Sequence, residues 1–269
     1  MSFEIIRRGA LEYLISTEIE TPHCFSTRYG GLSEGNLSSL NLGIHCGDKP
    51  ENCRKNYEIL GNAVGFRPED TVFFHQVHSD IVRRVGKIDR GCGFDEARQS
   101  APCDGLLTND PDVALTVFGA DCTTVLLHDP KRRAAAAVHA GWRGTAAGIV
   151  KNAVEALQRE FGADPADIRA AIGPCIGRCC FETHREVPDA MLAALGVDAL
   201  PAIDVLGMRE DGEKFSVDLK LLNAIWLRRA GVDRIDVCPD CTACQPDRFW
   251  SHRRTGGHRG SQAAIIVLK

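Results

Sequence analysis

The feature that most constrains the fold is a pair of short apolar runs, residues 123–127 and 134–138, joined by His-Asp-Pro-Lys-Arg-Arg. Asp-Pro is a turn signal, because the proline ring presets the backbone angle of the first central position of a β-turn. The pattern therefore predicts an antiparallel hairpin, with Pro130 and Lys131 as the central residues of its turn.

Similar short runs recur along the chain, and many neighbours are separated only by turn-forming residues. Strands are predicted at residues 71–77, 81–85, 104–108, 113–117, 168–172, 234–237 and 263–268. Helices are predicted at residues 50–61, 145–161 and 218–230, each followed by a glycine that can stop a helix. Because short turns favour antiparallel neighbours, we expect mixed or antiparallel sheets rather than a doubly wound parallel sheet.

The composition is that of an ordinary globular protein. Of the 269 residues, 44% are hydrophobic and 25% are charged, which is enough for a large core. No repeat and no low-complexity linker divides the chain, so residues 1–269 are expected to form a single domain. The net charge of −4 and the lack of a basic block with interleaved aromatic residues argue against a nucleic-acid partner.

The sequence also indicates in which cellular compartment the protein is found. No apolar run reaches the roughly 18 residues needed to span a bilayer, and the first residues carry acids that a signal peptide lacks. Twelve cysteines are hazardous in an oxidising environment unless they are paired. We therefore expect no membrane association and a cytoplasmic location.

A cysteine and a histidine lie at the open end of the predicted hairpin. With the turn assigned above, Cys122 faces His139, and facing Cβ atoms in a sheet are about 4.5–5.5 Å apart. That spacing allows both side chains to bind one metal ion. The alternative is a buried cysteine beside a histidine that only bonds to the backbone.

A catalytic zinc ion usually takes three protein ligands and leaves one position open, so a third ligand is needed. His78 and His75 are the candidates, because both follow a strand-like run. Strand alternation places these two side chains on opposite faces, so only one of them is expected to reach the site. Spacing does not decide between them.

The segment after His139 offers a possible anion site. Gly141, Arg143, Gly144 and Thr145 lie between a strand end and a predicted helix start. Free backbone N–H groups at a helix start and one arginine can bind an anion beside a metal. A glycine turn with a solvated arginine explains the same residues equally well.

A second set of cysteines has metal-ligand spacing. Cys238, Cys241 and Cys244 form C-x2-C-x2-C, and three more cysteines are found at positions 175, 179 and 180. Such spacing can hold zinc or an iron–sulfur cluster if a fourth ligand comes from another loop.

Seven motifs resemble, in order, those of the laccase-domain family, which is variously named polyphenol oxidase, multicopper oxidase-like, purine nucleoside phosphorylase and peptidoglycan editing factor. The resemblance extends from about Cys24 to Lys269, nearly the whole chain. Its motifs are His-Ala-Gly-Trp-Arg-Gly (139–144), Ala-Asp-Cys (120–122), Gln-Val-His (76–78), Phe-Ser-Thr-Arg-Tyr-Gly-Gly (25–31), Leu-Asn-Leu-Gly (40–43), Ile-Gly-Pro-Cys-Ile-Gly (172–177) and Phe-Trp-Ser-His-Arg-Arg (249–254). The resemblance implies an α+β fold, a single-domain four-layer α-β-β-α sandwich with mixed sheets, similar to cytotoxic necrotizing factor-like cysteine hydrolases.

The resemblance also implies site residues. Carried over motif by motif, the zinc ligands are His78, Cys122 and His139, which favours His78 over His75 and does not require a second metal. Five further residues belong to motifs around the metal, in substrate contact or behind the ligands: Arg28, Asn41, Gln76, Asp121 and Arg143. The chain departs from the usual pattern at Thr124, where the family has proline, and at His252, where it has tyrosine.

Three activities follow from the resemblance. The first is a zinc-dependent purine nucleoside phosphorylase of broad specificity, acting on adenosine, inosine, guanosine and methylthioadenosine with phosphate, with adenosine deamination as a side activity. The second is a copper-dependent polyphenol oxidase, or laccase, although none of the nine histidines forms the His-x-His pairs of multicopper sites. The third is a cysteine hydrolase of peptidoglycan precursors that uses Cys122 as nucleophile and His139 as base. We expect an enzyme that works as a monomer or weak homodimer on small molecules.

Overall fold

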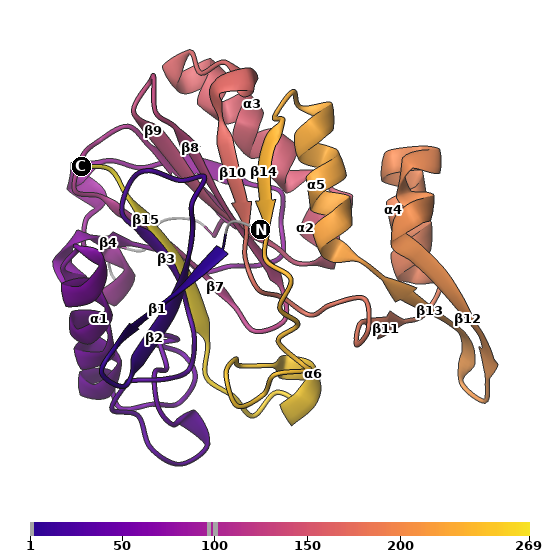
Figure 1. Ribbon diagram of the computed structural model, residues 1–269, viewed down its shortest axis with the longest axis horizontal. Helices are drawn as coiled ribbons and strands as arrows, with labels where there is room; N and C mark the ends of the chain where they lie inside the picture. Colours follow the sequence, from indigo (N-terminus) through magenta and orange to yellow (C-terminus); the bar gives the residue numbers. More distant parts are fainter. Residues whose placement is uncertain (1–2, 96–97, 99–101) are drawn as a thin grey trace.

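A computed structural model describes residues 3–95, 98 and 102–269, and its centre consists of two six-stranded mixed sheets packed face to face (Figure 1). The first sheet has the order β1-β2-β3-β15-β7-β4, with strands Phe3–Arg8, Leu11–Ser16, His23–Ser26, Gln262–Val267, Ala114–Gly119 and Thr71–Val72. The second has the order β14-β10-β8-β9-β6-β5, with strands Arg234–Val237, Arg169–Ile172, Thr123–Asp129, Ala134–Ala140, Gly105–Thr108 and Val82–Arg84. The expected mixture of parallel and antiparallel pairs is confirmed.

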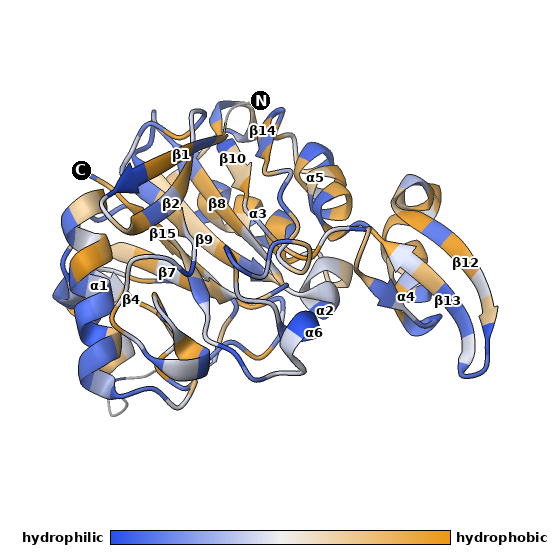
Figure 2. Ribbon diagram, turned by 60° about the horizontal axis from the view of Figure 1, so that its bottom comes forward, coloured by the Kyte–Doolittle hydropathy of each residue, from blue (hydrophilic) through white to orange (hydrophobic). Residues whose placement is uncertain are grey.

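Helices cover the outer face of each sheet. Helix α1 (Pro50–Val64) packs on the first sheet, and α3 (Ile149–Phe161) and α5 (Leu219–Arg229) pack on the second. Strand β8 is buried on both faces: Leu126 belongs to the core between the sheets, whereas Leu127 faces the helices. Burial on both sides explains why the run is continuously apolar rather than alternating. These layers confirm the expected four-layer α-β-β-α sandwich; Figure 2 shows the hydrophobic strands in its interior.

A smaller unit projects from the sandwich and was not predicted. It is a three-stranded sheet of order β11-β13-β12, and helix α4 packs beside it (Figure 1). These elements span Glu182–Thr183, Gly212–Val217, Ile203–Arg209 and Glu186–Leu195 in that order. The sequence Glu-Asp-Gly at 210–212 was the available signal, because Asp-Gly is typical of tight hairpin turns.

The observed helix ends differ from the predicted ones mainly at glycines. Helix α1 continues past Gly61 and ends at Val64, before Gly65, whose φ of 106° is left-handed. The helix predicted at 145–161 is two helices, α2 (Trp142–Ala146) and α3, because Gly148 takes a φ of 75° between them. The third predicted helix agrees with α5 to within one residue at each end. A last short helix, α6, spans His252–Thr255.

The turn of the predicted hairpin is longer than expected. Four residues connect β8 to β9, and the carboxylate of Asp129 accepts backbone N–H groups from Lys131 at 2.8 Å and Arg132 at 3.0 Å. Arg133 then takes a left-handed φ of 49° before β9 begins. A side chain that caps its own turn in this way stabilises the longer loop.

The longer turn changes the register. Thr124, rather than Cys122, pairs with His139, so the prediction that Cys122 directly faces His139 is wrong. Cys122 lies just before β8, and its sulfur is still within 4.8 Å of the ring of His139. The two predicted ligands are therefore close together, although they do not pair directly.

Among the described residues, no helix combines the length and apolar character that crossing a membrane requires.

The capped turn predicts a difference between two variants of Asp129, whose side chain is fully buried. Asp129→Ala removes Oδ1, the oxygen that accepts both N–H groups, and should lower the free energy of unfolding by about 1–3 kcal/mol. Asp129→Asn keeps one side-chain oxygen for the same N–H groups, so its loss should be smaller. Urea denaturation measures both values, and equal losses in the two variants would count against the capping role.

Candidate metal centre and its pocket

Three side chains from separate segments converge at one end of β8 and β9, the two central strands of the second sheet. His78 lies in the segment after β4, Cys122 immediately precedes β8, and His139 lies near the end of β9. Their ligand atoms all lie within 4.8 Å of one another, and Cys122 Sγ is 3.7 Å from His78 Nε2. A tetrahedral metal with ordinary sulfur and nitrogen bond lengths would separate these atoms by roughly 3.6 Å. The group therefore has the spacing and the donor types of a metal site.

The structure separates the two candidate histidines. His78 belongs to the group, and its ring centroid lies 4.9 Å from that of His139. His75 instead lines a different cavity, where its ring is 6.4 Å from that of His45. Regular strand alternation does not apply here, because β4 ends at Val72.

One buried carboxylate, that of Asp104, holds two of the three ligands. Its Oδ1 accepts the backbone N–H of His78 at 2.9 Å and lies 2.8 Å from Nδ1 of His139. Its Oδ2 accepts the backbone N–H and the hydroxyl of Ser79, both at 2.7 Å. Because Nδ1 of His139 is bonded to this carboxylate, Nε2 is the nitrogen that can bind a metal.

Charge interactions within the group favour a thiolate beside an imidazolium. Burial would raise the pKa of the Cys122 thiol, but the adjacent His139 and His78 lower that pKa to about 6. Burial would lower the pKa of His139, but the Cys122 thiolate and Asp104 raise it to about 9. Burial would also raise the pKa of Asp104, but hydrogen bonds from His139 and Ser79 hold it well below its usual value. At neutral pH the metal-free group therefore keeps its proton on His139.

Gly141 provides the space in which the ligands meet. A Cβ atom at this position would lie 2.6 Å from Cδ2 of His78 and 3.2 Å from Sγ of Cys122. The first distance is too short for any side chain, so the position requires glycine. Together with the distances and the bonded Nδ1 of His139, this close fit shows that the residues suit a bound metal.

Asp121, the residue before Cys122, anchors that ligand to distant segments. Its φ of 91° is unusual for a residue other than glycine. Its carboxylate accepts the hydroxyl of Thr242 at 2.6 Å, the hydroxyl of Ser251 at 3.0 Å and the backbone N–H of Arg253 at 2.6 Å. These bonds compensate for the unfavourable backbone conformation of Asp121 and fix the position of the next residue, Cys122.

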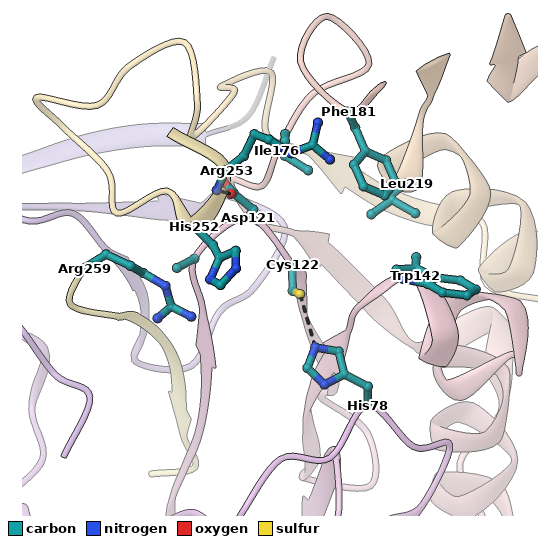
Figure 3. Close-up of a pocket in the computed structure, with 11 residues that line it drawn as sticks. His78, Asp121, Cys122, Trp142, Ile176, Phe181, Leu219, His252, Arg253 and Arg259 are labelled. Atoms are coloured by element: carbon teal, nitrogen blue, oxygen red, sulfur yellow. Dashed lines mark hydrogen bonds between the residues drawn. The ribbon is translucent and has the colours of Figure 1, made fainter. Parts of the chain in front are cut away.

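A cavity of about 320 Å³ opens beside the group (Figure 3). Figure 3 shows an apolar wall to one side of Cys122 and basic side chains to the other. The apolar wall consists of Trp142, Ile176, Phe181 and Leu219, and the basic side of His252, Arg253 and Arg259. Both His78 and Cys122 reach the cavity, so a metal held there would be accessible to a small molecule.

The other predicted site residues lie at different distances from this cavity. Asp121 lines it, whereas Gln76 lines the neighbouring cavity and exchanges hydrogen bonds with the backbone of Phe118 at 2.7 and 3.0 Å. Arg143 is exposed, and its guanidinium lies 4.2 Å from the ring centroid of Trp142, which does line the cavity. Arg143 can therefore act on the cavity through Trp142.

Arg28 and Asn41 line neither of these two cavities. Arg28 stacks on Trp250 and donates to the backbone carbonyls of Ser38 and Pro246. Asn41 is fully buried, and its amide bonds to backbone and to Asp48. The structure gives both residues the contacts of loop anchors.

Sequence reasoning missed Asp104 and Arg259. Asp104 was assigned only to the start of a strand, although a single acid beside an apolar run was a signal, because a buried carboxylate needs partners. Arg259 follows the last family motif and had no distinguishing pattern of its own.

Comparisons with known proteins agree on one family. The family model described as multi-copper polyphenol oxidoreductase laccase matches residues 22–269. Purine nucleoside phosphorylase YlmD of Geobacillus stearothermophilus is 36% identical over 245 residues, which cover 90% of this chain and 88% of that protein. Purine nucleoside phosphorylase YfiH of Escherichia coli is 35% identical over 246 residues, which cover 91% of this chain and 93% of that protein.

Solved structures show the same fold. The hypothetical protein YfiH of Bacillus licheniformis is 34% identical and superposes with a TM-score of 0.91, covering 98% of each chain. YlmD of Geobacillus stearothermophilus is 33% identical, with a TM-score of 0.89 and the same coverage.

The bonds of Asp104 predict the effect of Asp104→Asn. An amide has one acceptor oxygen where the carboxylate has two, so the variant should lose the orientation of either His139 or the 77–79 backbone. We expect metal affinity to fall about 10–100-fold while the protein stays folded. Competition with a chromogenic chelator measures the affinity. Asp110→Asn is the matched control, because Asp110 accepts a backbone N–H from Lys87 at the opposite end of β6.

The proton on His139 predicts the pH dependence of metal binding. Between about pH 6 and 9 the metal-free group holds a thiolate at Cys122 and a proton on His139, which a metal must displace. Affinity should therefore rise about tenfold per pH unit in this window, with one proton released per metal. Calorimetry in buffers of different ionisation enthalpy counts the proton, and an affinity independent of pH would contradict the assignment.

Proposed function

The chain belongs to the family described as multi-copper polyphenol oxidoreductase laccase, and we propose that it is a zinc-dependent purine nucleoside phosphorylase of broad specificity. The names of its relatives support the reaction. The observation that carries the proposal for this chain is the cavity, in which an apolar wall and a basic side flank a group of metal ligands (Figure 3).

His78, Cys122 and His139 would hold the zinc ion. One sulfur and two imidazole nitrogens are a donor set typical of zinc with three protein ligands. With these three residues as its ligands, a bound zinc ion would leave one position for substrate or water and would polarise the molecule there.

The apolar wall suits a purine ring. Trp142 and Phe181 present aromatic surface, and Leu219 completes a wall that contacts the face of a ring rather than its substituents. Adenosine, inosine, guanosine and methylthioadenosine share this face and differ at their edges or at the 5′ carbon. Recognition through the face therefore supports broad specificity.

The basic side suits phosphate. Arg253 and Arg259 can neutralise and orient the anion beside the ribose. A phosphate oxygen would then attack C1′ as the bond from C1′ to the purine nitrogen breaks. The proton of hydrogen phosphate passes to the departing purine, so the products are ribose 1-phosphate and the free base. His252 lines the same side and can hydrogen-bond to the purine edge as charge develops on it.

Water in place of phosphate would allow a second reaction. Attack at C6 of adenosine would release ammonia and leave inosine, which is the adenosine deaminase side activity that we include in the proposal. The twelve free cysteines support a reducing compartment such as the cytoplasm.

A cysteine hydrolase is the second candidate function. It is favoured by the pairing of a Cys122 thiolate with a protonated His139 in the metal-free group. Zinc and a free nucleophile exclude each other at Cys122, so the two functions require different states of the protein. A covalent adduct on Cys122 after chelation and incubation with an activated acyl or amide substrate would support this candidate.

The phosphorylase proposal predicts that zinc and activity are lost together. Cys122→Ala and His139→Ala should each bind less than one-tenth as much zinc and lower kcat/KM for inosine phosphorolysis at least 100-fold. Ribose 1-phosphate formation and zinc content are measured on the same samples. Cys46→Ser is the control, because Cys46 lies outside the ligand group.

Two outcomes would contradict this proposal. Phosphorolysis that persists in zinc-depleted protein would remove the role of the metal. Phenol oxidation with oxygen uptake by zinc-loaded, copper-free protein, without phosphorolysis, would favour the polyphenol oxidase instead.

A further inference from the structure

A second group of potential metal ligands lies outside the His78, Cys122 and His139 site. Cys179 and Cys180 come from the segment between β10 and β11, and Cys241 and Cys244 from the segment between β14 and α6. Their four sulfur atoms all lie within 4.8 Å of one another. Segments that are far apart in the sequence thus bring four thiols together.

The sulfur spacing distinguishes a metal site from a disulfide. Sγ of Cys244 lies 3.5 Å from that of Cys179 and 3.3 Å from that of Cys180. A disulfide joins its sulfurs at about 2.05 Å and joins only two of them. Four sulfurs around one tetrahedral zinc ion are about 3.8 Å apart, since each Zn–S bond is about 2.3 Å. The observed distances are near the second value, and Cys244 has two close partners.

The backbone near the cluster is arranged to receive thiolates. The N–H of Gly177 donates to Sγ of Cys241 at 3.1 Å. A Cβ atom at Gly177 would lie 3.1 Å from Cβ of Cys241 and 3.2 Å from Sγ of Cys179. Glycine thus lets the two segments approach closely, as Gly141 does at the first site. Cys241 and Cys244 also have the C-x2-C spacing of structural zinc sites.

We propose that Cys179, Cys180, Cys241 and Cys244 bind a second metal ion, zinc, in a closed tetrathiolate site. With four protein ligands the ion has no open position, so its role is structural rather than catalytic. The C-x2-C-x2-C interpretation of the sequence is corrected in one respect. Cys238 is not a ligand; it is fully buried, and its carbonyl accepts a hydrogen bond from Lys220 at 2.7 Å.

The proposed site would support one wall of the cavity. Thr242, between two of the ligands, donates to the carboxylate of Asp121 at 2.6 Å. The backbone N–H of Ile176, which lies in the same segment as Cys179 and Cys180, donates to the Asp121 carbonyl at 2.9 Å. Ile176 and Phe181, which flank Cys179 and Cys180, both line the cavity. A metal at the cluster would hold these residues in place beside Cys122.

Metal stoichiometry tests the proposal without using activity. Protein purified under reducing conditions should contain two zinc ions per chain by mass spectrometry of the metals. Cys122→Ala should keep one of them, and Cys241→Ser with Cys244→Ser should keep the other. Cys46→Ser, which alters a cysteine outside both groups, should keep two.

Cobalt substitution of the Cys122→Ala variant provides a second test that leaves the cluster intact. Cobalt bound by four thiolates should give strong sulfur-to-metal charge-transfer and tetrahedral ligand-field absorption, at one cobalt per chain. The proposal is overturned if this variant binds no metal, if it contains iron instead of zinc, or if peptide mapping finds the cluster cysteines in disulfides. None of these results depends on whether the protein is a phosphorylase.

Discussion

The hydrogen bonding of one buried carboxylate, Asp104, is the constraint on which the candidate metal centre depends. A buried anion is costly unless its oxygens are bonded. Asp104 meets this requirement with the backbone N–H groups of His78 and Ser79 and with the ring of His139. The same bonds hold His78 at a φ of 61°, a conformation that an unsupported histidine rarely adopts. The placement of two ligands is therefore a consequence of satisfying one buried charge.

The sandwich supplies the rigidity that this arrangement needs. His139 lies in β9, where every residue of Ala134–Ala140 is buried and most side chains are small. Small side chains let helix α3 and the first sheet pack closely against opposite faces of the strand, which restricts the imidazole to one position. The other two ligands come from irregular segments. His139 lies in a rigid strand, and buried carboxylates hold His78 and Cys122. The shape of the site is therefore set before any metal binds.

Sequence patterns predicted most of the sandwich, because apolar periodicity records which faces are buried. The predictions were wrong where the hydrogen bonds of a single side chain set the local structure. The cap formed by Asp129 lengthens the hairpin turn and shifts the register, so that Thr124 instead of Cys122 pairs with His139. Periodicity could not separate His75 from His78, since neither lies in a regular strand. The role of Asp104 was missed, because its hydrogen bonds join segments that are far apart in the sequence.

Asp121 supports the placement of Cys122 as Asp104 supports the placement of the two histidines. It precedes Cys122, and its carboxylate collects donors from Thr242, Ser251 and Arg253. Thr242 belongs to the segment that carries the cysteine cluster, so a displacement of that segment would pull on the residue next to a metal ligand. The placement of the three ligands thus depends on two buried carboxylates, those of Asp104 and Asp121. Changes in loop sequence that preserve Asp104 and Asp121 should therefore alter which substrates fit the cavity without displacing the metal ligands.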